Sequence, residues 1–149
     1  MTRPDRSALA AHPVLRGLSA AAIDRLLPLV TEVDVAAGTW LGREGAPAAE
    51  FHLVRHGSVA LEMHAPGREA TRLETLGPGE LVGWSWLVPP YRWQFDAVAV
   101  TAVGLFSVDA EGLRAAMAAQ PSLGYPLLAR FLPVAVNRLQ AARFRLMGG

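Results

Sequence analysis

The spacing of hydrophobic residues changes twice along the chain. Over residues 12–29 apolar residues such as Ile23 and Leu26 recur at helical spacing, and Ser19 is a suitable N-cap. Over residues 30–109 short runs of apolar residues are separated by glycine and proline. Many short strands with frequent turns are typical of an all-β sandwich or barrel. The pattern therefore predicts a helix followed by a β-rich region.

Helical spacing returns over residues 110–146. Asp109 is a natural N-cap for a first helix, which Pro121 ends. A second helix follows, and Pro133 is expected to kink it because proline removes a backbone hydrogen bond. Apolar residues along this second helix are alternately four and three apart, as in the seam of a coiled coil. They are Leu128, Leu132, Ala135, Leu139, Ala142 and Leu146.

Composition narrows the class of protein. A chain of 149 residues fits one domain. It has no uninterrupted apolar stretch of the roughly 18 residues that a membrane span requires, and its N-terminus lacks a signal pattern. The net charge of +1 gives no general attraction to nucleic acid, and the absence of cysteine excludes disulfides and thiolate chemistry. We therefore expect a cytoplasmic protein that binds neither membranes nor DNA.

The order of these elements, together with four motifs, resembles the cyclic-nucleotide-binding domain of the Crp/Fnr type. The motifs are HPVLRGLSAAAIDRLL, VAAGTWLGREGAPAAEFHLVRHGSVAL, LETLGPGELVG and FSVDAEGLRAAMAAQPSLGYPLL. The resemblance covers residues 12–146 and implies a mainly β fold in one domain, residues 1–149. That fold is a double-stranded β-helix, or jelly roll, with an N-terminal helix and two C-terminal helices. It also implies a regulatory protein that is not an enzyme.

The resemblance places a phosphate-binding cassette at residues 77–97, but its polar residues differ from the family's pattern. Trp84 stands where the family has a ribose-binding glutamate, and Phe95 stands where it has a phosphate-binding arginine. Asp96 replaces a serine or threonine, and its carboxylate would repel a phosphate. Gly79, Gly83, the apolar Leu87 and the small residue Ala97 match the pattern, but the polar positions do not, so ordinary binding of cAMP is not expected.

Of three interpretations of the cassette, we adopt the first, a sensor that binds its ligand in the β-roll and signals through the C-terminal helix to a partner; the other two stay open. The first is a re-tooled pocket for another nucleotide or small anion, in which Arg92 reaches the phosphate and the tryptophans stack on a ring. Its ligand-binding residues would be Gly83, Trp84, Ser85, Trp86, Arg92, Asp96 and Ala97. The second is that the aromatic side chains fill the pocket, leaving a structural or docking subunit of a larger complex, for example one with a redox enzyme. The third is binding of a cyclic nucleotide after all, and no other cofactor is implied.

Neither a catalytic site nor a metal site is expected. His52 and His56 are four residues apart but lack a third nearby ligand. Glu44, Glu50 and Glu80 are not spaced as an acid and a base. Phosphate-binding loops and nucleophile elbows are absent from the sequence.

In the family that this chain resembles, the long C-terminal helix packs against its twin. The seam therefore predicts a parallel homodimer, and the alternative is that the seam folds back onto its own β-roll. Arg130, Arg138, Arg143 and Arg145 form either a solvated basic face or a docking surface for an acidic partner. Because no helix-turn-helix follows before Gly149, we expect the signal to pass to a partner protein rather than to DNA.

Overall fold

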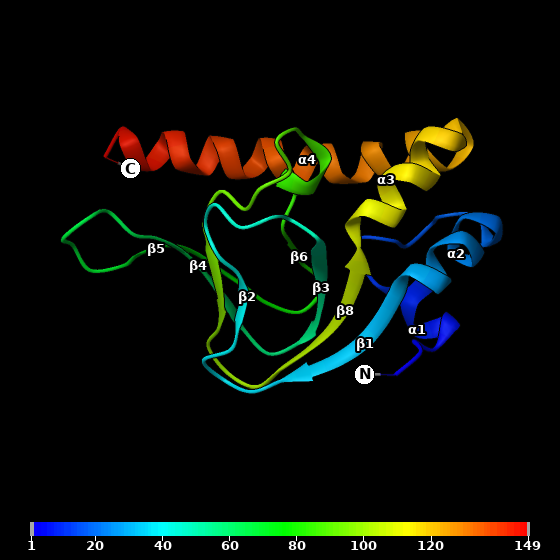
Figure 1. The fold of residues 1–149 in the computed structure, drawn as a ribbon, viewed down its shortest axis with the longest axis horizontal. Helices are drawn as coiled ribbons and strands as arrows, with labels where there is room; N and C mark the ends of the chain where they lie inside the picture. Colours follow the sequence, from blue (N-terminus) through cyan, green and yellow to red (C-terminus); the bar gives the residue numbers. More distant parts are fainter. Residues whose placement is uncertain (1, 149) are drawn as a thin grey trace.

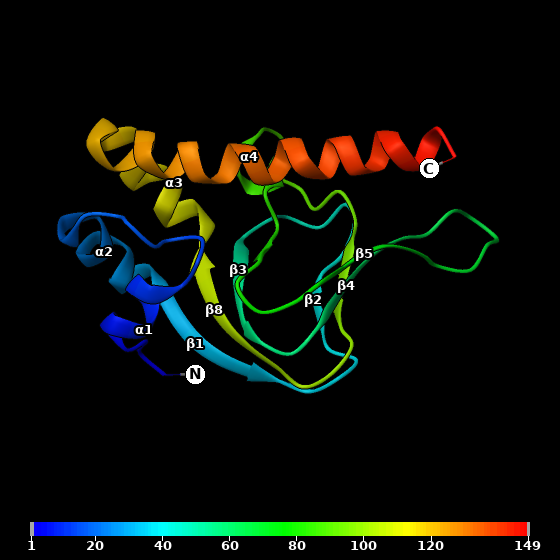
Figure 2. The same cartoon turned by 180° about the vertical axis from the view of Figure 1, so that it is seen from behind.

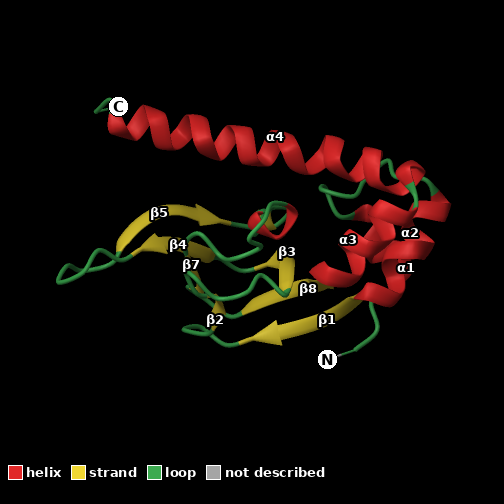
Figure 3. Cartoon of the chain, turned by 45° about the horizontal axis from the view of Figure 1, so that its top comes forward, coloured by secondary structure: helices red, strands yellow, loops and turns green. Residues whose placement is uncertain are grey.

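The computed structural model describes residues 2–148, and its β-rich region consists of two antiparallel sheets. One sheet has the strand order β1-β8-β3-β6 and the other β2-β7-β4-β5 (Figures 1 and 3). The strands are β1 (Val30–Val35), β2 (Trp40–Gly42), β3 (Glu50–His56), β4 (Val59–Met63), β5 (Thr71–Leu76), β6 (Leu81–Val82), β7 (Asp96–Ala99) and β8 (Val103–Asp109). This arrangement is the predicted jelly roll.

Buried side chains from both sheets and from the helices that cover the first sheet form the core. On β3 the residues from Phe51 to Val54 are all buried, and β8 is buried from Val103 to Val108. On β7 the inward-facing Ala97 and Ala99 are small, which leaves space inside the roll for large neighbours. Gly57 links β3 to β4 with φ of 90°, a conformation that favours glycine. The sharp turn there sends the chain from one sheet to the other.

The N-terminal region differs from the single helix predicted over residues 12–29. Two helices, α1 (Arg6–Ala11) and α2 (Ala20–Leu26), are separated by turns, and a 3₁₀ helix, η1 (Leu27–Leu29), follows α2. Pro13 and Gly17 interrupt the helix that the apolar spacing predicted, and the φ angle of Gly17 is 90°. The predicted N-cap is confirmed, because the Ser19 hydroxyl accepts a hydrogen bond from the Ala22 N–H at 3.1 Å.

Two helices follow the roll, α3 (Ala110–Ala119) and α4 (Pro121–Leu146). The predicted cap of α3 is confirmed, since the Asp109 carboxylate accepts from the Gly112 N–H at 3.1 Å. The helix α4 continues through Pro126 and Pro133 and lies across the roll (Figures 1 and 2).

The face of α4 that packs on the roll is not the predicted seam. Leu123, Leu127 and Phe131 are buried against the rest of the chain. Most of the seam residues point away, with exposed fractions of 63% for Leu132 and 61% for Leu139. The seam is therefore available for a contact outside this chain. Within residues 2–148 no helix is both long and apolar enough to cross a membrane.

Candidate functional site

The cassette, residues 77–97, connects β5 to β7 and crosses one end of the roll beneath α4. It contains β6, a turn at Gly83, the 3₁₀ helix η2 (Ser85–Leu87) and a loop that reaches the surface at Val88. Gly83 has φ of 95°, and a Cβ atom there would lie 2.9 Å from Trp93 Cη2. A Cβ atom on Gly42 would collide with the same indole. The two glycines therefore allow the Trp93 ring to lie close against the backbone.

Trp86 anchors the cassette to the rest of the molecule. Its side chain is 1% exposed and stacks on Phe51 of β3, with ring centroids 4.2 Å apart and planes 6° apart. Phe131 of α4 packs edge-on against Trp86 at 5.3 Å and against Phe51 at 5.6 Å. Arg114 of α3 donates a hydrogen bond to the Trp86 carbonyl at 2.9 Å. Cassette, roll and C-terminal helices thus meet at one aromatic cluster.

A second aromatic group lies around Trp93. Phe95 packs against Trp93 with ring centroids 6.2 Å apart, and the His52 ring lies nearly parallel to it at 6.4 Å. All three side chains are buried. The His52 Nδ1 atom accepts from the Ser107 hydroxyl at 2.8 Å, and its Nε2–H points to the Leu41 carbonyl at 3.4 Å. Burial lowers the pKa of His52 to about 4, so the ring is neutral inside the roll.

The neutral state of His52 predicts acid sensitivity. The unfolded chain takes up a proton at His52 below pH 6.5, whereas the folded chain does so only near pH 4. Stability present above pH 6.5 is therefore lost progressively as the pH falls to 4, by about 3 kcal/mol. Urea unfolding measured across this range tests the prediction. His52→Gln should have a flatter profile, and an unchanged slope in that variant would contradict the assignment.

Asp96 is held by donors of its own chain. Its buried carboxylate accepts from the Glu44 backbone N–H at 2.8 Å, His64 Nδ1 lies 2.6 Å from it, and Arg43 Nε lies 3.8 Å away. His64 follows β4, and Arg43 and Glu44 follow β2. An internal anion thus occupies a group of donors that would otherwise suit a bound anion.

The structure places the remaining predicted ligand residues in different surroundings. Arg92 is exposed and donates to the Gly45 carbonyl at 2.8 Å, so it does not point into the roll. Ser85 is buried in η2, and Ala97 is buried on β7 between β2 and β4. Trp84 is half-buried and caps η2. These residues share one segment but do not line a common cavity with Arg92.

Sequence reasoning missed the side chains that complete the cassette's surroundings. Phe51 and Phe131 are far from the cassette in sequence, and only the buried position of Phe51 in its motif was a signal. His64 and Arg43 lie beyond the ends of β4 and β2; Arg43 falls within a quoted motif but was not singled out there, and His64 lies in none of the motifs. Arg114 reaches the cassette from α3 and also lies 4.0 Å above the Tyr91 ring.

Two antiparallel sheets closed into a roll, a glycine-bounded cassette and helices after the last strand define a β-roll domain with flanking helices. The sequence profile of the cyclic nucleotide-binding domain family matches residues 32–120, more than half of the chain. This chain belongs to the cyclic nucleotide-binding domain family. Domains of this family are typically regulators that bind cyclic nucleotides and are not enzymes.

Solved structures of other members have the same fold. A cyclic nucleotide-binding protein from Geobacter metallireducens superposes with a TM-score of 0.82 at 20% identity, covering 91% of this chain and 98% of that one. A cyclic nucleotide-binding domain from Methylobacillus flagellatus gives 0.84 at 17% identity, covering 99% and 86%. The catabolite activator protein of Thermus thermophilus gives 0.70 at 25% identity, and the match covers 90% of this chain but only 61% of that protein. No curated protein sequence is significantly similar to this chain.

The cassette of this chain does not fit a cyclic nucleotide. No arginine side chain of the cassette turns inward to meet a phosphate, because Arg92 is exposed. The Asp96 carboxylate already holds the nearby donors and would repel a second anion. The rings of Trp86, Trp93 and Phe95 are buried in the core. Membership of the family therefore fixes the fold, while the chemistry of this cassette departs from nucleotide binding.

Proposed function

We propose that this chain is a non-enzymatic regulatory module that keeps the family's roll but does not bind a cyclic nucleotide in it. The observation that carries the proposal is that the chain's own groups fill the cassette. Trp93 and Phe95 are buried inside the roll beside His52. Trp86 is buried on the opposite face of β3 against Phe131 of α4. The Asp96 carboxylate takes the available donors. A nucleotide would have to displace close-packed rings and an internal anion, which is unfavourable on both counts.

In this proposal the module works in the cytoplasm by docking to a partner protein that supplies the output. The aromatic cluster ties the cassette to α4 through Phe131, so α4 keeps a fixed position over the roll. The exposed seam of α4 then presents a constant apolar surface. A filled roll with a fixed helix suits a structural or docking subunit better than a switch that a ligand must close.

A sensor of a small polar ligand is the second candidate, because three buried N–H groups have no acceptor among residues 2–148. They are Trp84 Nε1, Trp86 Nε1 and Arg138 Nη1. Trp86 packs on Phe131 of α4, and Arg138 of α4 donates to the Leu81 carbonyl of β6 in the cassette. Buried donors without acceptors are costly, and a phosphate or carboxylate bound there would satisfy them.

Thermal unfolding with added nucleotides separates the two candidates. We expect millimolar cAMP, cGMP, NAD(P)H, ATP and cyclic di-GMP to leave Tm unchanged. A ligand present at about 100 times its Kd would add about 2.7 kcal/mol of stability, which is readily measured. A higher Tm with cAMP or cGMP would overturn the proposal, and a higher Tm with another nucleotide would favour the sensor.

We also propose that the seam of α4 forms a parallel homodimer. Leu139→Glu places a charge in the centre of the apolar seam and is expected to convert a dimer into a monomer, because a buried unpaired charge is unfavourable. Gln140→Glu adds the same charge on the neighbouring exposed position, outside the seam, and should leave the dimer intact. Light scattering coupled to size exclusion measures both masses. A monomeric wild-type protein, or equal effects of the two variants, would contradict the dimer.

A further inference from the structure

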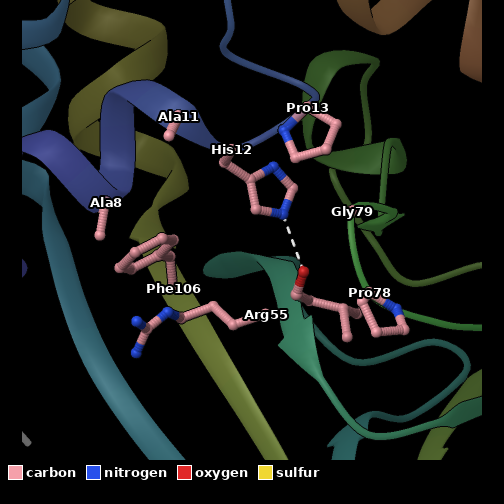
Figure 4. Close-up of a pocket in the computed structure, with 9 residues that line it drawn as sticks. Ala8, Ala11, His12, Pro13, Arg55, Pro78, Gly79 and Phe106 are labelled. Carbon is pink, nitrogen blue, oxygen red and sulfur yellow. Dashed lines mark hydrogen bonds between the residues drawn. The ribbon is translucent and has the colours of Figure 1, made fainter.

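A groove runs along the outside of the roll, between the N-terminal segment and α4. It consists of two cavities of about 300 and 420 Å³ that share Pro13 and Gly79. The first lies between the turn at His12 and the outer face of the roll at Phe106 (Figure 4). The second continues from Val14 to α4. Because the two cavities share two residues, they form one elongated site.

The charged side chains that line this groove are arginines. Arg55 lines the first cavity, and Arg16 and Arg130 line the second, whereas neither lining includes an aspartate or a glutamate. The whole chain, by contrast, has 13 acidic and 14 basic residues. Glu80 adjoins Gly79, but its carboxylate is turned to the Gly77 N–H at 2.6 Å. The groove is thus locally basic on a nearly neutral protein.

The position of Arg130 is fixed without neutralising its charge. Its guanidinium donates to the backbone carbonyls of Arg16 at 2.8 Å and Pro126 at 3.3 Å. Gly17 leaves room for it, because a Cβ atom there would lie 3.1 Å from Arg130 Nη2. Among residues 2–148 no carboxylate forms an ion pair with Arg130 or Arg16. Both cations are therefore available to an external anion.

Arg55, His12 and the apolar side chains line the rest of the groove. Arg55 pairs with Glu32 and lies over the Phe106 ring at 4.7 Å, so most of its charge is already used. The hydrogen bonds of His12 are those of a neutral imidazole. Its Nε2–H donates to the Val54 carbonyl at 2.8 Å (Figure 4). Its Nδ1 accepts from the Val14 N–H at 3.2 Å. Other lining residues are apolar, namely Ala8, Ala11, Pro13, Val14, Val54, Pro78, Phe106 and Val134. The groove therefore combines apolar walls with two free cations at one end.

We infer that this groove docks an extended acidic segment of a partner protein, an inference that rests on the docking function proposed above. Each cavity alone has the volume of a small-molecule site, so the joined groove suits an elongated chain. Apolar side chains of the segment would cover the walls, and its carboxylates would meet Arg16 and Arg130. Since Arg130 and Val134 belong to α4, the docked segment contacts the helix that carries the seam.

Fluorescence anisotropy of the full chain tests this inference with a defined probe. The probe is a fluorescein-labelled peptide, Glu-Glu-Ala-Leu-Pro-Leu-Glu-Glu, in which proline opposes helix formation. We expect saturable binding that weakens as salt is added, and no binding of the same peptide with lysine in place of glutamate. Arg16→Glu reverses an exposed charge in the groove and should weaken binding about tenfold. Val134→Glu tests the apolar wall independently and should also weaken binding.

The matched control is Arg143→Glu, which makes the same charge change on the exposed end of α4, and it should alter affinity less than about twofold. Equal loss in Arg143→Glu and Arg16→Glu, or binding of the lysine peptide, would overturn the inference. Binding to vesicles of equal phosphatidylcholine and phosphatidylglycerol without binding to the peptide would also overturn it, in favour of a membrane surface. A nucleotide that raises Tm would refute the proposed function but not peptide binding in the groove, so the two failures are distinguishable.

Discussion

Trp86→Ala is expected to lower the free energy of unfolding by about 3–5 kcal/mol, because it removes a fully buried indole and leaves a cavity. The substitution removes packing contacts among three elements, since Trp86 of η2 contacts Phe51 of β3 and Phe131 of α4. Urea denaturation at pH 7 measures it. Trp86→Phe keeps an aromatic ring for stacking and should recover a substantial part of the loss.

Trp40 provides the matched control for this prediction. Its side chain is 41% exposed at the edge of the second sheet, with Arg43 over the ring at 4.1 Å. Trp40→Ala removes the same group from the surface and should cost less than about 1 kcal/mol. Similar losses in Trp40→Ala and Trp86→Ala would mean that Trp86 does not anchor the cassette.

Asp96→Ser is expected to have two effects. The Glu44 N–H, His64 and Arg43 lose a common, buried carboxylate partner, so the free energy of unfolding should fall by about 2–4 kcal/mol. The same donors then form an empty anion site. Millimolar inorganic phosphate should therefore raise Tm of the variant more than Tm of the wild-type protein.

Asp34→Ser is the control, because Asp34 is exposed and its carboxylate lies 3.7 Å from His56 Nε2. It removes the same charge from beside another histidine, but phosphate should stabilise this variant no more than the wild type. If phosphate acted equally on both variants, the donors around Asp96 would not form an anion site.

Much of the fold was predictable because many helices and strands begin or end at residues whose own chemistry favours a cap or a turn. Ser19 and Asp109 mark helix starts by capping, and frequent glycines mark the turns between short strands. A helix before the roll was confirmed as α2, but its predicted start was wrong, since apolar spacing continued through Pro13 and Gly17, where the backbone turns. The helix α1 was missed because its six residues, which include only one buried side chain, carry little periodic signal.

The site was predictable only in part, since its contacts join distant segments. The sequence indicated that Trp84, Phe95 and Asp96 depart from the family's pattern. It left open whether the aromatic residues form a surface, a pocket or a core, because this depends on Phe51, Phe131 and the glycines that admit Trp93. It also left open where the Asp96 carboxylate points, which His64 and the Glu44 N–H determine from other strands.

The most direct test of the filled cassette is to follow the indole N–H signals by NMR during a titration with cAMP. The chain has four tryptophans, so the signals of Trp86 and Trp93 can be assigned by single substitutions. We expect that neither signal moves at millimolar cAMP and that the Trp86 N–H exchanges slowly with solvent, because that side chain is 1% exposed. Saturable shifts of both signals would show that a nucleotide binds at the cassette and would contradict the proposal that the chain's own side chains fill it.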